Sequence, residues 1–401
     1  MFSRVIIIIL DACGVGELPD ARLYGDCGAA TLPNLAREFG GLNMPVCGRL
    51  GLGNIVPITG IPPSLNPLAG YGKMAEISPG KDSTSGHWEI GGIILEKPFP
   101  LYPDGFPDYL VAEFERRAGI KTIGNIPASG TDIIQNLGQK HLETGAVILY
   151  TSADSVFQLA AHEDIIPLDR LYDICRIARQ LLQNEHAVGR VIARPFVGTP
   201  GNFTRTANRR DFSLPPPADT FLDRLHQKNI PTVSIGKIYD LYAGRGIARA
   251  VKTGNNRDVM DKLSAELNIT HRGCIFANLV DFDMLWGHRN DTLSFAQGLE
   301  EFDGWLESFL EKLTDNDLLI ITADHGCDPT MRNSTDHTRE YVPLLVYNKD
   351  MVAGVSLGTR RSFADIAATI DDIFELDGYF KRRQHGIMPA SFLKEIVHCL
   401  G

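Results

Sequence analysis

Six short runs of mostly aliphatic residues recur along the chain and constrain its fold more than any other feature. Each run is too short for a buried helix and is followed by polar residues, as expected of strands that are covered on both faces. Between them, Leu168–Leu182 and Leu299–Leu313 carry apolar residues three and four positions apart, a spacing typical of amphipathic helices. This alternation predicts an α/β protein with a mostly parallel sheet flanked by helices. The runs are Val5–Leu10, Val147–Tyr150, Val233–Ile235, Ile275–Val280, Leu318–Thr322 and Val342–Tyr347.

Two proline-rich stretches suggest how the chain is divided. At 401 residues the chain exceeds the size at which one hydrophobic core usually stops growing. The stretches KPFPLYPDGFP, at Lys97–Pro107, and LPPPAD, at Leu214–Asp219, are typical of domain boundaries. Because strand-like runs continue on both sides, we expect a discontinuous core domain of residues 1–98 and 215–401, with a smaller α/β cap domain inserted at 99–214.

Charge and cysteine content exclude several classes of function. The formal net charge of −10 argues against nucleic acid or an anionic membrane as a partner. The seven cysteines include no CxxC spacing, so a disulfide framework or thiolate zinc site is not expected, and a reducing compartment is favoured. The apolar run near the N-terminus is too short to span a bilayer, and no cleavage-site pattern follows it. We expect a soluble cytoplasmic protein that acts on small molecules, and no protein partner is predicted.

Acidic residues follow three of the predicted strands. Asp11 ends the first run, Asp281 and Asp283 follow the fourth, and Asp324 with His325 follows the fifth. Ligands of parallel sheets bind beyond the carboxyl ends of the strands, so these side chains are candidates to share one crevice. A single such aspartate is about as often only the N-cap of the next helix.

Histidines near these aspartates favour a metal site. His288 lies five residues after Asp283. His337 lies in the stretch STDHTRE, which comes shortly after Asp324 and His325. Carboxylates mixed with imidazoles suit Mn²⁺, Zn²⁺ or Mg²⁺, and six such ligands are enough for two ions. Two adjacent ions can activate an attacking oxygen and neutralise a transferring phosphoryl group.

The stretch SPGKDSTSGHWEIGG, at Ser78–Gly92, offers a nucleophile for such a centre. On its own it would be interpreted as a polar surface loop, because Ser, Gly, Asp and Pro are ordinary turn residues. A hydroxyl is a poor nucleophile unless a cation lowers its pKa. Ser83 or Thr84, in a glycine-bounded turn, could bring an oxygen to the metals.

Motifs along nearly the whole chain resemble those of the alkaline phosphatase superfamily and, within it, of the phosphopentomutases. The resemblance implies an alkaline-phosphatase-like core with an inserted α/β cap, two Mn²⁺ ions and a phosphorylated hydroxyl. It also implies interconversion of ribose or deoxyribose 1-phosphate with the 5-phosphate, activated by a hexose or pentose bisphosphate. The matching stretches are ILDACGVGELPDA, GKDSTSGHWE, GNIPASGTDII, YTSADSVFQLAAHE, GRVIARPFVGTPGNFTRTANRRD, IGKIYD, NLVDFDMLWGHR, TADHGCDPT and TDHTREYVPLL.

The resemblance also assigns roles to particular residues. One metal falls to Asp11, Asp324 and His325, and the other falls to Asp283, His288 and His337. The family usually has threonine directly after the aspartate of the GKD turn, where this chain has Ser83. Related phosphoglycerate mutases use serine at the matching position. We therefore choose Ser83 as the nucleophile and keep Thr84 as the second candidate.

Arginines are concentrated in one segment of the predicted cap. Their planar forks match phosphate oxygens, although for any one of them a solvated surface position is about as likely as a phosphate contact. By resemblance, the substrate is bound by Asp154, Arg190, Arg205 and Lys237, and Arg194 is expected to be structural because Pro195 follows it. The clustered arginines are Arg190, Arg194, Arg205, Arg209 and Arg210.

Three classes of function compete for this set of residues. A mutase needs a cap that excludes water from the phosphoenzyme, whereas a phosphatase of the same superfamily leaves it open to water. A non-catalytic sugar-phosphate binding protein would keep the ligands but would not need the hydroxyl. The cap-sized insert with its arginines favours the mutase.

Overall fold

The computed structural model describes residues 2–152, 154–382 and 384–397. The chain forms two compact units that join at Pro98/Phe99 and at Pro215/Pro216. We call the discontinuous unit, formed by the two ends of the sequence, the core unit, and the continuous unit Phe99–Pro215 the inserted unit. From the two proline-rich stretches, the sequence analysis predicted an inserted domain of residues 99–214.

The core unit is built on an eight-stranded sheet with the order β10-β9-β11-β1-β12-β13-β2-β14. Neighbouring strands are parallel, except that β13 is antiparallel to both β12 and β2. The strands are β1 (Arg4–Leu10), β2 (Gly70–Met74), β9 (Thr232–Ile235), β10 (Arg249–Val251), β11 (Gly273–Leu279), β12 (Asp317–Thr322), β13 (Val342–Tyr347) and β14 (Ser356–Arg360).

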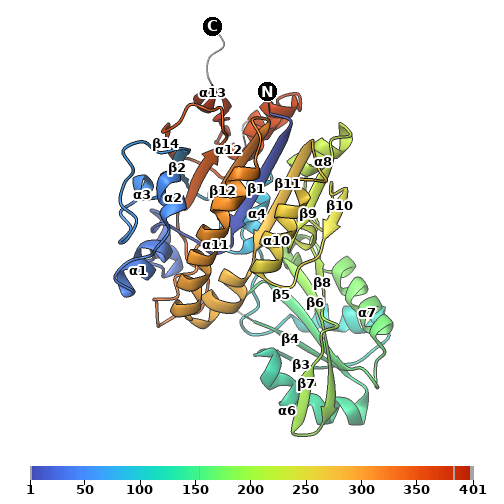
Figure 1. Cartoon of the computed structure of the whole chain (residues 1–401). Coiled ribbons are helices and arrows are strands. Elements are labelled where there is room, and N and C mark those ends of the chain that lie inside the picture. Colours follow the sequence, from blue (N-terminus) through green and yellow to red (C-terminus); the bar gives the residue numbers. More distant parts are fainter. Residues whose placement is uncertain (1, 153, 383, 398–401) are drawn as a thin grey trace. The chain divides into compact units, whose positions relative to one another are not determined.

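Helices cover both faces of this sheet (Figure 1). One group includes α10 and α11, with α1 and α2 packed against α11, and the other includes α4, α8, α9 and α12. The helices of the core unit are α1 (Thr31–Glu38), α2 (Pro45–Leu50), α3 (Leu52–Ile55), α4 (Ser83–Ile90), α8 (Phe221–Gln227), α9 (Ile238–Leu241), α10 (Asn256–Glu266), α11 (Thr292–Lys312), α12 (Asp365–Phe374) and α13 (Leu393–Ile396).

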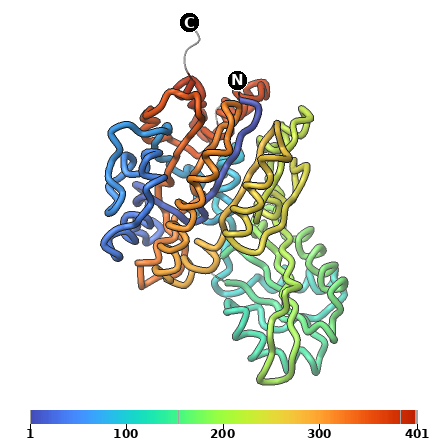
Figure 2. Tube along the Cα trace, in the orientation of Figure 1, coloured from blue at the N-terminus to red at the C-terminus, as the bar shows by residue number. Residues whose placement is uncertain are grey.

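Strand β1 lies at the centre of the core. Every residue of β1 is buried, as is every residue of its neighbours β11 and β12. Figure 2 shows the N-terminal β1 running between segments that are more than 260 residues further along the chain, since Arg4 pairs with both Gly273 and Asp317. The continuous aliphatic run therefore reflects a strand covered by helices on both sides.

The inserted unit has its own sheet, in which β3-β4-β5-β6-β7 follow one another and β8 also pairs with β6. Val147 and Leu149 of β4 pack into one apolar cluster with α5 and α7, whereas Ile148 and Tyr150 pack into another with α6. This alternation is the two-residue period of a strand, so both faces of the sheet are covered. The elements are α5 (Asp108–Ala118), β3 (Thr122–Pro127), α6 (Gly130–Thr144), β4 (Val147–Thr151), β5 (Val156–His162), α7 (Leu168–Leu181), β6 (Arg190–Thr199), β7 (Asn202–Arg205) and β8 (Arg210–Ser213).

The predicted α/β class, with a mostly parallel sheet flanked by helices, is confirmed. The six aliphatic runs form strands, except that Val280 follows the end of β11, and the first predicted helix forms α7, which ends at Leu181. The other predicted helix begins earlier than the apolar spacing indicated, at Thr292 rather than Leu299, because Asp291 caps it by accepting a hydrogen bond from Ser294 N. Among the described residues, no helix combines the length and apolar character needed to cross a membrane.

Candidate active site

The six predicted metal ligands converge at one edge of the core sheet. Asp11 directly follows β1, Asp283 lies in a π-helical turn (η3, Phe282–Trp286) after β11, and Asp324 and His325 follow β12. Because β11, β1 and β12 are adjacent and parallel, their carboxyl ends meet at the same edge. His288, in the short helix η4 (Gly287–Arg289), and His337, in the segment before β13, complete the set.

Asp11, Asp324 and His325 form the first group. All three are buried, and their ligand atoms lie within 4.8 Å of one another. His325 Nε2 is 3.3 Å from both Asp11 Oδ1 and Asp324 Oδ2. His325 Nδ1 is 3.0 Å from the carbonyl oxygen of Gly326, a contact that holds the Nδ1 proton there and leaves Nε2 to face the carboxylates.

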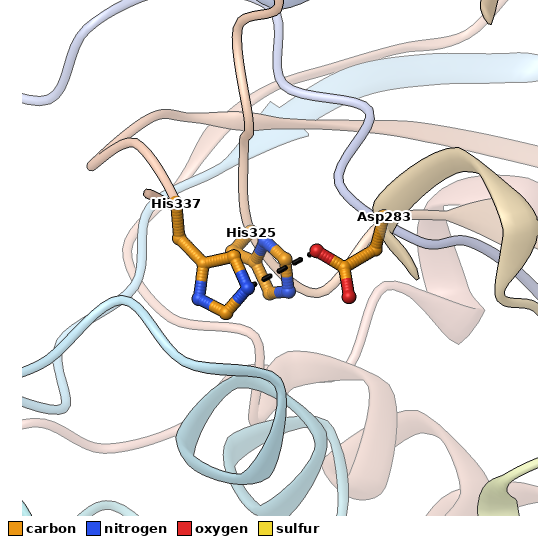
Figure 3. A group of neighbouring side chains, drawn as sticks. All are labelled: Asp283, His325 and His337. Atoms are coloured by element: carbon orange, nitrogen blue, oxygen red, sulfur yellow. Dashed lines mark hydrogen bonds and ion pairs between the residues drawn. The ribbon is translucent and has the colours of Figure 1, made fainter. Parts of the chain in front are cut away.

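The second group surrounds Asp283. Asp283 Oδ1 lies 3.1 Å from His337 Nε2 and 3.2 Å from His288 Nε2. His288 Nδ1 is 2.6 Å from the carbonyl oxygen of Thr335, so Nε2 again faces the carboxylate. Figure 3 shows Asp283, His325 and His337 facing one another, and their ligand atoms form a further compact group. The two groups are therefore adjacent, and His325 lies close to both.

The electrostatics of the first group fit a bound cation. Asp11 Oδ1 and Asp324 Oδ2 are buried and near histidine nitrogens, yet accept no hydrogen bond in the described structure. Burial and the charges of Asp324 and Asp283 raise the pKa of Asp11. Buried carboxylate oxygens without a donor are costly, and a cation bound between them would offset that cost.

The histidines around Asp283 have the opposite effect on its carboxyl group. Burial opposes ionisation of Asp283, but His337, His288 and His325 outweigh burial and hold its pKa well below the usual range. A carboxylate that stays ionised beside imidazole nitrogens suits Mn²⁺ or Zn²⁺. The donor set of carboxylates and imidazoles therefore fits divalent metal ions.

Ser83 is the hydroxyl of the GKD turn that reaches this centre. It is the first residue of α4, and Asp82 caps the helix by accepting hydrogen bonds from Thr84 N and Ser85 N. Ser83 Oγ lies 3.2 Å from His325 Nε2. Ser85 Oγ instead donates to Glu76 Oε1 at 3.0 Å. Among the hydroxyl contacts that the structure describes in this turn, only that of Ser83 reaches one of the six predicted ligands.

A buried arginine that the sequence analysis did not single out anchors the turn before α4. Arg339 donates to Glu76 Oε2 at 2.7 Å and to the carbonyl oxygens of Ser78 and Gly80 at 2.8 and 2.7 Å. Arg339 lies two residues after His337, so it ties the segment of one predicted metal ligand to the turn that carries Ser83. Its presence in the stretch TDHTREYVPLL was the only cue in the sequence.

The predicted substrate residues are divided between the two units. In the inserted unit, Arg190 pairs with Asp154, with Nη2 3.5 Å from Asp154 Oδ2. Arg205 is the last residue of β7 and is exposed. In the core unit, Lys237 follows β9 and is close enough to Asp11 to lower its pKa, against the larger effects of burial and neighbouring acids.

Two further residues of the inserted unit lie near the arginines and were missed from the sequence. Asp211 accepts two hydrogen bonds from Arg209, each 2.7 Å long, and lies 3.7 Å from Arg190. Burial raises the pKa of Tyr150, whereas the nearby charges of Arg194, Arg205 and Arg209 oppose that rise. The buried Tyr150 hydroxyl has no hydrogen-bond partner among the described residues. Only the fold brings these side chains together.

Two other arginines of the segment have structural contacts. Arg194 is partly buried and donates from Nε to Gln158 Oε1 at 3.2 Å, which agrees with the structural role expected of it. Arg210 lies over the rings of Tyr172 and Phe212, 5.3 and 5.4 Å from their centroids. A guanidinium stacked on two rings stabilises the local packing and is less available to a ligand.

Comparison with known proteins identifies the class of the chain and then its family. The Metalloenzyme superfamily model matches residues 3–378, so the chain belongs to that superfamily. Curated relatives named phosphopentomutase include that of Carboxydothermus hydrogenoformans, which is 57% identical over 94% of this chain and 96% of its own length. The relative from Caldanaerobacter subterraneus subsp. tengcongensis is 56% identical over 94% of this chain and 95% of its own length. The relative from Clostridium novyi is 54% identical over 99% of this chain and 100% of its own length. The chain belongs to the phosphopentomutase family, and is an isomerase that acts as a pentose phosphate mutase.

Proposed function

We propose that the enzyme interconverts ribose 1-phosphate or deoxyribose 1-phosphate with the corresponding 5-phosphate through a phosphoserine and a sugar bisphosphate. The observation that carries this proposal is the 3.2 Å contact between Ser83 Oγ and His325 Nε2, next to six clustered ligands. Family membership supports the pentose phosphate as substrate.

We propose Mn²⁺ for both ions. Asp11, Asp324 and His325 would hold one ion, and Asp283, His288 and His337 would hold the other. When bound, two divalent cations lower the pKa of a nearby hydroxyl and neutralise charge on the phosphoryl oxygens. Asp11 Oδ1 and Asp324 Oδ2 accept no hydrogen bond and both face His325 Nε2 at 3.3 Å, which supports this assignment.

The side chain of Ser83 carries the phosphoryl group between two positions of the sugar. Phosphorylated Ser83 gives its phosphoryl group to the free hydroxyl of a pentose monophosphate: the phosphorus–Oγ bond breaks, a new phosphorus–oxygen bond to the sugar forms, and the proton of the sugar hydroxyl passes to Ser83 Oγ. The resulting bisphosphate reorients and returns its other phosphoryl group to Ser83. A hexose or pentose bisphosphate phosphorylates Ser83 when the resting enzyme lacks the group.

Substrate recognition is proposed for the remaining predicted residues. The planar forks of Arg190 and Arg205 match phosphate oxygens, and Asp154 can accept a hydrogen bond from a sugar hydroxyl. Lys237, close to Asp11 on the core unit, would add positive charge for the transferring phosphoryl group. The unpartnered hydroxyl of Tyr150 among the arginines supports an anion as the ligand of this part of the inserted unit.

The reaction can be tested with the full chain loaded with Mn²⁺, ribose 5-phosphate and a catalytic amount of a hexose bisphosphate. We expect ribose 1-phosphate to form, with little free phosphate. Free phosphate as the main product would instead indicate the phosphatase alternative. Binding of ribose 5-phosphate without turnover would indicate a non-catalytic sugar-phosphate binding protein.

The nucleophile can be tested by mass spectrometry of protein incubated with the bisphosphate. We expect the phosphate on Ser83, so Ser83→Ala should lose both the phosphoenzyme and turnover while still binding two ions. Ser83→Thr should remain active because it restores the residue usual in the family. Thr84→Val is the matched control and should turn over normally. Phosphate on Thr84 would move the assignment to the second candidate.

The substrates are the only partners we propose, and no nucleic acid, membrane or protein partner is predicted. A cytoplasmic location is proposed because the six cysteines that the structure describes are free thiols, five of them buried, as is usual in a reducing compartment.

A further inference from the structure

A buried asparagine and a buried histidine link two of the proposed metal ligands. Asn278 lies within β11 and His87 lies in α4, and neither is accessible to solvent. Asn278 Nδ2 is 3.0 Å from Asp11 Oδ2 and 3.1 Å from His87 Nε2. His87 Nδ1 is 2.8 Å from the carbonyl oxygen of Ser83 and 3.0 Å from Asp324 Oδ2.

The contacts determine where the protons lie. The amide atom beside Asp11 Oδ2 must be the NH₂ group, because a carbonyl oxygen there would face a carboxylate oxygen. The same nitrogen donates its second hydrogen to His87 Nε2, which therefore accepts. The proton of His87 is then on Nδ1, which donates to the carbonyl oxygen of Ser83 and also lies 3.0 Å from Asp324 Oδ2.

This arrangement leaves one oxygen of each aspartate available. Asp11 Oδ2 accepts from Asn278, while Asp11 Oδ1 accepts no hydrogen bond. Asp324 Oδ1 accepts from Ala12 N at 3.3 Å, while Oδ2 accepts none and lies between His87 and His325. A carboxylate with one oxygen fixed by a donor has its other oxygen pre-oriented for a cation.

We propose that Asn278 and His87 are positioning residues for phosphoryl transfer. They hold Asp11 and Asp324 in orientations that bind one ion, and through the carbonyl of Ser83 they fix the helix that carries the nucleophile to the same centre. This inference rests on the proposed function, because it takes Asp11 and Asp324 as ligands of one ion and Ser83 as the nucleophile. Asn278 and His87 themselves neither touch substrate nor serve as ligands.

Titration of the metal-free full chain with MnCl₂, followed by the electron paramagnetic resonance signal of free Mn²⁺, tests this role. Asn278→Leu removes both donated hydrogen bonds at similar side-chain size. We expect it to weaken binding of one of the two ions by about 10- to 100-fold and to leave the other unchanged. The turnover number should fall, with the KM for ribose 5-phosphate unchanged.

Asn348 provides a matched control for Asn278. It is also buried and donates two hydrogen bonds from its amide, to the carbonyl oxygens of Asp315 and Asp317. Asn348→Leu should lower the free energy of unfolding but leave both Mn²⁺ affinities at the wild-type value. Equal losses of affinity in Asn348→Leu and Asn278→Leu would show a general effect of stability and overturn the inference.

Substitutions of His87 test the second half of the pair. His87→Asn keeps an amide donor near the position of Nδ1, whereas His87→Leu removes it, so His87→Asn should retain more Mn²⁺ affinity and turnover. Wild-type Mn²⁺ affinity in both Asn278→Leu and His87→Leu would refute the inference while the proposed function stands. A wild-type chain that binds no Mn²⁺ would refute the proposed function, and the inference with it.

Discussion

Replacement of Gly86 by alanine tests how closely α4, which carries the proposed nucleophile Ser83, must approach the segment of the predicted ligand Asp324. Gly86 lies in α4, and a Cβ atom there would lie 2.1 Å from the carbonyl oxygen of Asp324 and 2.9 Å from its carbonyl carbon. Ordinary van der Waals contact begins at 3.4 Å, so the helix or the segment would have to move by more than about 1 Å. The helical backbone itself accepts alanine, so only the lack of space opposes the change.

The magnitude follows from two opposing effects. Alanine in place of glycine inside a helix normally raises the free energy of unfolding by about 1 kcal/mol. Overpacking against a backbone atom costs about 1–3 kcal/mol, so we expect Gly86→Ala to destabilise the protein by up to about 2 kcal/mol. The effect on turnover should be larger, because a shift of about 1 Å between Ser83 and the ligands can reduce the rate by about 100-fold.

Gly304 is the matched control for this substitution. It lies within the helix α11, is exposed, and has no other group within 4 Å of the position that a Cβ would take. Gly304→Ala should therefore raise the free energy of unfolding by about 1 kcal/mol without a change in turnover. The two variants receive the same methyl group, so the difference between them isolates the contact with Asp324.

The assay is denaturant unfolding of both variants, together with turnover of ribose 5-phosphate. The reasoning predicts opposite signs for the two changes in stability and a loss of activity in Gly86→Ala alone. A Gly86→Ala enzyme that is as stable and as active as the wild type would refute the claim that backbone contact between α4 and Asp324 sets the position of Ser83.

Three further predictions concern the metals, the inserted unit and pH. Exhaustive chelation should abolish turnover and Mn²⁺ should restore it, and full activity without metal would contradict the two-ion proposal. Arg205→Ala should raise the KM for ribose 5-phosphate by about 10- to 100-fold, as expected for loss of a charged hydrogen bond, whereas the exposed Arg117→Ala should leave it unchanged in the same kinetic assay. Burial raises the pKa of Glu340 from 4.5 to about 7, so its contribution to stability is present in full below pH 4.5 and is lost as the pH rises to about 7. Unfolding experiments across this pH range should show the free energy of unfolding of the wild type falling by about 3 kcal/mol, a fall that Glu340→Gln lacks. Equal pH profiles of the two proteins would contradict this prediction.

The strand-end residues of the site could be predicted because they depend on local patterns. An aliphatic run followed by an acidic residue identifies a strand and what lies at its carboxyl end, as for Asp11 and Asp324. The rule that parallel strands place these ends at one edge then brings the residues together. His288 and His337 follow no such rule, since they come from a short helix and a connecting segment. The sequence placed His288 five residues after Asp283, but only the resemblance to the family assigned both histidines to the same ion as Asp283.

Asn278 shows where prediction from the sequence ends. It stands in IFANLV, a run whose other residues are apolar, and a buried amide in such a strand must have hydrogen-bond partners. The sequence thus contained a cue that Asn278 is paired, but nothing local names the partners, which lie 267 residues away at Asp11 and 191 residues away at His87. Gly86 poses the same problem, because its importance depends on the backbone carbonyl group of Asp324, and a pattern of side chains in the sequence does not reveal a backbone contact. The predicted ligands of the site follow from strand ends and family motifs, whereas the residues proposed to hold those ligands in place depend on which strands become neighbours.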